Sequence, residues 1–213
     1  TLIMYMFKIE KFPEKIKLFL HNRENQIKIL GEPTSNFNAF YNFFSAKGKY
    51  IAFCEGDDVW TDPLKLQKQV DFLENNPHYV FTHHRFLSIN TDGSHLTGNE
   101  ENLQPKKDLS SQALLRVKYH PLLLCTCFRN NLKEIPLEMT RVINVDTFLF
   151  SLLGQFGEAK FLNDIKPAEY RRHPGGIWSR RKKQKKFHSK IITYQNLTGY
   201  YRRKNNRDLV QYY

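Results

Sequence analysis

The hydrophobic and polar positions of this sequence form short apolar runs separated by longer amphipathic stretches. Residues 50–54 are continuously apolar, without a helical or alternating period, which is typical of a strand covered on both faces. Residues 61–77 place Leu66, Val70 and Leu73 on one face of a predicted helix. A buried strand that leads directly into an amphipathic helix is the local unit of an α/β sheet.

The same patterns predict further elements along the chain. Helices are expected over residues 35–48, 109–117 and 145–157, and strands over residues 14–21, 78–90, 121–128, 159–163 and 167–173. A turn is expected at Asp92-Gly93 and a polar loop over residues 99–108. This alternation predicts an α/β domain of three layers, with a mostly parallel sheet flanked by helices.

Composition and charge divide the chain into two parts. With 213 residues, 40% hydrophobic and 14% aromatic, it is long and apolar enough for one substantial core. The net charge of +12 lies entirely in the last part, because 13 Lys or Arg residues from Arg171 onward stand against the single acid Asp208. We therefore expect a folded domain over residues 1–179 and a basic, helical tail over residues 180–213.

The basic tail allows three interpretations. An apolar stripe is predicted beside its charges, formed by Phe187, Ile191, Tyr194 and Tyr201. A solvated helix face is the commonest meaning of such a pattern, and an anionic membrane surface is the next. Nucleic acid is not expected as a partner, because no nucleic-acid motif accompanies the charge.

Cysteine usage and hydropathy indicate the compartment. The three cysteines form neither a disulfide framework nor a Cys-x-x-Cys motif, which favours a reduced setting. No apolar run approaches the roughly 20 residues that span a bilayer. We expect a cytoplasmic chain, peripheral to the cytoplasmic face of the membrane if the tail binds lipid.

Three carboxylates follow the apolar run directly, namely Glu55, Asp57 and Asp58. In open α/β sheets, ligands bind just beyond the carboxyl ends of the strands. Clustered carboxylates repel one another unless a cation lies between them, and such oxygen ligands suit Mg²⁺ or Mn²⁺. On the residues alone a metal site and a solvated acidic turn stay equally open, because Gly-Asp-Asp is also common in turns.

The order of apolar strand, acidic turn and capped helix, preceded by Gly48-Lys49-Tyr50, resembles the metal-binding segment of inverting glycosyltransferases of the GT-A fold, similar to family 2. In that family a strand-end Asp-Asp, the DxD-type motif, holds the divalent cation that bridges the phosphates of a nucleotide-sugar donor. The resemblance gives this role to Asp57 and Asp58. Glu55, also expected at the donor, stands where the family often has Asp.

Two later stretches extend this resemblance. Asp146, near the start of a predicted helix, matches the acid that serves the family as general base on the acceptor hydroxyl. From the residues alone, a helix N-cap is the favoured interpretation of Asp146, and the resemblance favours the base. In residues 170–179, His173 is a candidate third metal ligand or a surface His in a Pro-Gly turn. Arg171 and Arg172 are candidates for phosphate contacts with the donor.

The resemblance runs from about residue 8 to about residue 180 and lacks the family's N-terminal strands. It implies a metal-dependent enzyme that transfers a sugar from a nucleotide-diphosphate sugar to a glycan or lipid-linked acceptor with inversion. Two alternatives stay open. One is a catalytically inactive remnant, or a basic module that binds polyanions or membranes. The other is a nucleotidyltransferase, which is less favoured because the sequence has no Gly-rich basic phosphate loop.

Overall fold

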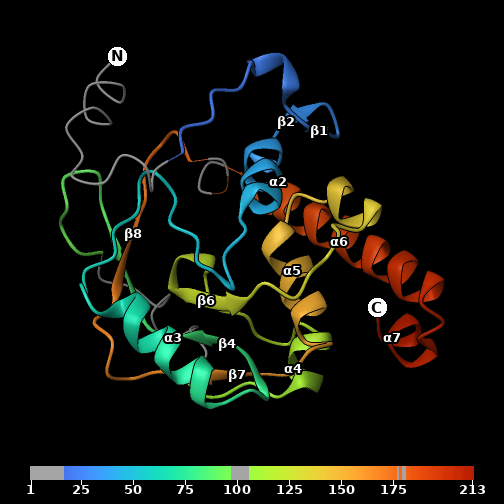
Figure 1. The fold of residues 1–213 in the computed structure, drawn as a ribbon. Helices are drawn as coiled ribbons and strands as arrows, with labels where there is room; N and C mark the ends of the chain where they lie inside the picture. The colour runs from blue at the N-terminus through green and yellow to red at the C-terminus, as the bar shows by residue number, and fades with distance from the viewer. Residues whose placement is uncertain (1–16, 97–105, 177, 179–180) are drawn as a thin grey trace.

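The computed structural model describes residues 17–96, 106–176, 178 and 181–213 (Figure 1). The centre of the described chain is a four-stranded sheet with the order β3-β6-β4-β7. Its strands are β3 (Tyr50–Ile51), β4 (Tyr79–His83), β6 (Thr126–Arg129) and β7 (Glu158–Phe161). Strand β6 runs antiparallel to both of its neighbours, whereas β4 and β7 are parallel.

Two smaller sheets accompany the central one. The first pairs β5 (Phe86–Ile89) with β8 (Ala168–Arg171) in parallel, and the second pairs β1 (Lys28–Ile29) with β2 (Glu32–Pro33) in antiparallel fashion. The α/β class is therefore confirmed, but the described strands form mixed sheets and not the mostly parallel sheet that was expected. A short apolar run shows that a strand is buried and does not show its direction, which explains this difference.

Six α-helices surround these strands within the described residues. They are α2 (Asn36–Ser45), α3 (Lys65–Asn75), α4 (Ser111–Leu115), α5 (Val145–Leu153), α6 (Lys183–Arg203) and α7 (Arg207–Tyr212). Three short 3-10 turns, η2 (Arg23–Asn25), η4 (Leu123–Cys125) and η5 (Leu137–Arg141), complete the connections. The helices predicted over residues 35–48, 109–117 and 145–157 are confirmed as α2, α4 and α5.

Helix α5 is the centre of the hydrophobic core. Every side chain from Thr147 to Leu153 is buried. Phe150 packs on Phe81 of β4, with ring centroids 5.2 Å apart, and so joins the helix to the central sheet. A helix that is apolar on all sides is stable only in such a fully covered position.

The basic tail is helical and its inner face belongs to the same core. Leu197, Tyr200 and Tyr201 of α6 are buried, and the Tyr201 hydroxyl lies 2.8 Å from Oγ of Ser151 in α5. Figure 1 shows α6 and α7 on the side of the molecule opposite β8. The predicted apolar stripe is divided, because Phe187 is exposed whereas Tyr201 is buried.

Some of the predicted elements differ from the structure. Residues 17–21 of the strand predicted over 14–21 are irregular, and residues 14–16 lie outside the described chain, as does most of the predicted loop over 99–108. The buried face of α3 consists of Lys65, Gln69 and Leu73, so the predicted face with Leu66 is wrong. Two of the three buried residues of α3 are polar, so the pattern of hydrophobic residues could not predict this face.

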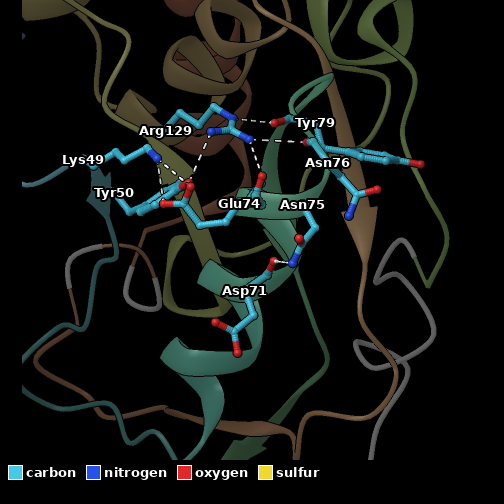
Figure 2. A network of polar contacts seen from close by, with 9 residues as sticks. Lys49, Tyr50, Asp71, Glu74, Asn75, Asn76, Tyr79 and Arg129 are labelled. Carbon is cyan, nitrogen blue, oxygen red and sulfur yellow. Dashed lines mark hydrogen bonds and ion pairs between the residues drawn. The ribbon is translucent and has the colours of Figure 1, made fainter.

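Arg129 at the end of β6 joins three elements at one corner of the sheet (Figure 2). Its Nε donates to the carbonyl of Tyr79, 2.9 Å away, and its Nη2 donates to the carbonyls of Leu73 and Asn76 at the end of α3. Nη1 lies 3.2 Å from the hydroxyl of Tyr50 in β3. The last carbonyls of a helix have no partner within the helix, and a cation there also interacts favourably with the helix dipole.

Replacing Arg129 by Met should lower the free energy of unfolding by about 3 kcal/mol, because the partly buried carbonyls lose a charged donor. Urea denaturation followed by circular dichroism measures this loss. The matched control is Lys49→Met, which breaks the exposed ion pair between Lys49 and Glu74 beside the same corner (Figure 2). The control should cost much less. Equal losses in the two variants would contradict the role given to Arg129.

Candidate functional site

The three carboxylates of the acidic turn meet beyond the end of β3. The amide of Asp58 donates to the carbonyl of Glu55, 3.1 Å away, and this closes a turn with Gly56 and Asp57 at its tip. One ligand oxygen from each of Glu55, Asp57 and Asp58 lies within 4.8 Å of the other two. Three hard oxygen donors at this spacing are chemically suited to a divalent cation such as Mg²⁺ or Mn²⁺.

Strand β8 holds the acidic turn in place from more than 100 residues away. Val59 and Glu169 exchange both backbone hydrogen bonds, at 3.0 and 2.9 Å. Oγ1 of Thr61 donates to the carbonyl of Pro167 at 2.6 Å, and the amide of Lys166 donates to Oδ2 of Asp62 at 3.1 Å. The chain after the acidic turn is therefore fixed to the segment that leads to Arg171, Arg172 and His173.

Arg171, at the end of β8, contacts the acidic turn directly. Its amide donates to Oδ1 of Asp58 at 3.0 Å, and its Nε donates to the carbonyl of Asp57 at 3.0 Å. Its Nη1 donates to the carbonyls of Asn90 and Thr91, which follow β5. The guanidinium thus joins the acidic turn to the residues that follow β5. Phosphate binding by Arg171 stays a prediction.

His173 also contacts the acidic turn. Its Nε2 is 2.9 Å from Oδ2 of Asp57. A carboxylate only accepts hydrogen bonds, so this contact requires the proton on Nε2. The metal-ligand group that the structure brings together consists of the three carboxylates, and metal binding by His173 stays a prediction. Arg172 follows in the same segment, where its amide donates to the carbonyl of Ile89.

Asp146 stands in the first turn of α5, where the helix dipole favours an acid. The N-cap position belongs to Asn144, and Oδ1 of Asp146 accepts a hydrogen bond from the amide of Thr147 at 2.7 Å. The N-cap interpretation of Asp146 is therefore wrong by two residues. The negative charge of Asp146 also contributes to the raised pKa of Glu55.

Electrostatics in the site favour a bound cation. Burial, together with the negative charges of Asp57 and Glu55, raises the pKa of Asp58 to about 6. The hydrogen bond from the Arg171 amide acts in the opposite direction. Loss of surrounding water, together with the charges of Asp57 and Asp146, raises the pKa of Glu55. Repulsion among ionised carboxylates is relieved when a cation lies between them. Repulsion among the ionised carboxylates thus destabilises the acidic turn at neutral pH, and a bound cation would relieve it.

A buried lysine follows the acidic turn, and the sequence patterns did not identify it. Lys65 is 1% exposed; its Nζ donates to Oε1 of Gln69 at 2.7 Å and lies 4.2 Å from the centre of the Trp60 ring. Burial lowers the pKa of Lys65 to about 8. Nε2 of Gln69 donates in turn to the carbonyls of Thr82 and Cys125. These hydrogen bonds join the first turns of α3 to β4 and to η4.

The raised pKa of Asp58 predicts a dependence of stability on pH. A carboxyl group with a raised pKa stabilises the folded state while protonated, and this contribution is lost as the pH rises through about 6. In metal-free protein at neutral pH, the free energy of unfolding of Asp58→Asn should therefore be about 1 kcal/mol higher than that of the wild type. The advantage should disappear near pH 4.

Urea denaturation in the presence of a chelator at both pH values measures this difference. The matched control is Asp71→Asn, which neutralises an exposed acid of α3. The control should show no such change between the two pH values. A difference between Asp58→Asn and the wild type that is independent of pH would contradict the assignment.

Comparisons with known proteins give relatives from mycobacteria. The uncharacterized proteins Rv1520 of Mycobacterium tuberculosis and Mb1547 of Mycobacterium bovis are each 36% identical to this chain over 138 residues. The match covers 63% of this chain and 38% of each relative, so the chain spans well under half of their length. No family model matches the sequence.

Among solved structures, S. aureus TarS 1–349, determined in complex with UDP-GlcNAc, is similar to this chain with a TM-score of 0.53. The identity is 12%, and the similarity covers 91% of this chain and 54% of that one. Similarity at this low identity concerns the fold. The chain therefore shares an α/β fold with that protein.

Proposed function

We propose that this chain contains the metal and donor site of a glycosyltransferase of the GT-A type, which transfers a sugar from a nucleotide-diphosphate sugar with inversion. The observation that carries the proposal is the meeting of three carboxylates beyond β3, in a fold similar to that of a protein bound to UDP-GlcNAc. Asp57 and Asp58 would hold a divalent cation, with Glu55 beside them. Such a cation supplies charge neutralisation for the departing nucleotide diphosphate.

The residues of the chain have distinct roles in this proposal. Arg171 keeps the acidic turn in one conformation through its backbone contacts, so that the carboxylates need not reorganise when they bind. Asp146 would take the proton from the acceptor hydroxyl as that oxygen attacks the anomeric carbon from the face opposite the leaving group. The acceptor, a glycan or a lipid-linked saccharide in this proposal, would approach from the side of α5.

His173 and Arg172 complete the proposed donor site. The hydrogen bond from His173 to Asp57 occupies a carboxylate oxygen that a cation would need. We propose that the imidazole leaves Asp57 when a cation binds and then either joins the metal or faces the donor phosphates. Gly175 and Gly176 follow directly and allow this segment to change its backbone conformation.

The first prediction of this proposal concerns metal-dependent binding. Isothermal titration with UDP, and then with other nucleoside diphosphates, should show binding that requires Mn²⁺ or Mg²⁺. Asp58→Asn should weaken the Mn²⁺-dependent part by about tenfold or more, because a charged ligand is lost. Asp71→Asn is the matched control and should bind as the wild type does. Unchanged Mn²⁺-dependent affinity in folded Asp58→Asn protein would remove Asp58 from the metal site.

The second prediction separates catalysis from binding. Asp146→Asn should lower the release of UDP from a UDP-sugar by about 100-fold or more, because the general base is lost, while the affinity for UDP with Mn²⁺ is kept. The amide keeps a similar shape and can still accept a hydrogen bond from the Thr147 amide. Normal turnover in the Asn variant would leave Asp146 with a purely structural role at the start of α5.

The same measurements test the two alternatives. A catalytically inactive remnant would bind nucleoside diphosphate with Mn²⁺ and release none from any donor, in wild type and variant alike. A nucleotidyltransferase would bind nucleoside triphosphates and release pyrophosphate. Neither an inactive donor site nor a nucleotidyltransferase has support from a specific contact among the described residues.

A further inference from the structure

The outer face of the first half of α6 carries exposed apolar and basic side chains. Ser189 and Thr193 face the protein and are buried, and they fix the orientation of this half of the helix. Positions on the opposite side are therefore directed outward. This outer face contains two large apolar residues, Phe187, 67% exposed, and Ile191, 39% exposed. They are four residues apart and so lie next to each other on the helix surface.

Lysines lie along one side of this apolar pair. Lys182, Lys183 and Lys190 are exposed, and no ion pair joins them to any residue that the structure describes. Nζ of Lys190 lies over the ring of Tyr194, 5.5 Å from its centre, so this lysine remains beside the helix surface. Lys183 and Lys190 flank Phe187 along the same face, at helical spacings of four and three residues.

Trp178 adds a third apolar group next to the start of α6. Its side chain is 39% exposed, and Nζ of Lys186 lies 5.2 Å from the centre of its ring. Arg181 and Lys185 are bound differently, because both form ion pairs with Glu32 of β2 and so hold the start of α6 against the fold. The cations beside Glu32 thus fix the helix, and the remaining cations are available to a partner.

From these observations we propose that the start of α6 is a membrane-contact surface, formed by Trp178, Lys182, Lys183, Lys186, Phe187, Lys190 and Ile191, which binds anionic phospholipid. Aromatic and aliphatic side chains enter the region between headgroups and acyl chains, and lysines beside them pair with lipid phosphates. The surface is peripheral by nature. No helix in the described part of the chain has the length and apolar character needed to cross a bilayer.

Charge and apolar groups together favour lipid over the other polyanions. A nucleic acid would use the lysines, but the aliphatic side chain of Ile191 beside Phe187 offers no ring on which a base can stack. A bilayer uses both kinds of group at once. This inference does not depend on the proposed catalytic function, and a vesicle-binding measurement contains no donor, acceptor or metal.

The test is sedimentation of the whole chain with vesicles. Mixed phosphatidylcholine–phosphatidylglycerol vesicles should bind the protein, vesicles of phosphatidylcholine alone should bind it weakly, and raising the salt above about 0.15 M should weaken the binding steeply. The double variant Lys183→Gln/Lys190→Gln should lose about 30-fold in affinity. Phe187→Ser should lose about tenfold. All variants are first checked for native circular dichroism, which exposed substitutions should preserve.

The matched control is Lys47→Gln/Lys118→Gln, which removes the same charge from exposed positions outside α6. Loss in the α6 variants with the control unchanged supports the surface. Equal loss in the control would mean that net charge alone attracts the vesicles, and would overturn the proposal. Absence of binding to anionic vesicles would do so too, as would preference for a single-stranded oligonucleotide at matched phosphate concentration. Deleting the tail is not a usable test, because α6 supplies Leu197, Tyr200 and Tyr201 to the core.

Discussion

The candidate site depends on hydrogen bonds between two short segments, residues 58–62 and 166–171, that are far apart in the sequence. Val59 pairs with Glu169, and the amide of Arg171 donates to Asp58. Without these bonds, three adjacent carboxylates would separate, because each raises the free energy of ionising the others. The fold therefore holds together side chains that repel one another, and it does so mainly with backbone groups of β8.

Arg129 fixes the ends of β3 and α3 that lie away from the acidic turn (Figure 2). It connects the end of α3 to the start of β4 and to Tyr50, so that β3 enters the acidic turn from a fixed position. Between these two supports, Lys65 and Gln69 link α3 to the central sheet through buried hydrogen bonds. Polar contacts thus position the strand–turn–helix unit, while aliphatic and aromatic side chains packed around α5 form the core.

The sequence predicted the acidic turn well, because its three carboxylates are neighbours in the chain. The structure also brings Arg171 and His173 into contact with this turn, and the roles that the family resemblance gives to them and to Asp146 stay predictions. The groups that position them could not be predicted, since backbone amides and carbonyls are the same in every residue. Strand direction escaped prediction for a related reason: an apolar run of four residues has the same pattern in parallel and antiparallel pairs. Lys65 was missed because a lysine usually marks an exposed face.

The buried side of α6 has a consequence for how this protein can change during evolution. The hydroxyls of Ser189 and Thr193 donate to carbonyls of their own helix, four residues earlier, and so require no partner across the interface. Small aliphatic residues could replace both without leaving an unpaired group. Related chains can therefore drift between polar and apolar residues at these positions while keeping the same packing. A sequence alignment scored by polarity would count a replacement of Ser189 or Thr193 by a small aliphatic residue as a mismatch. An alignment scored by side-chain size would count it as a match.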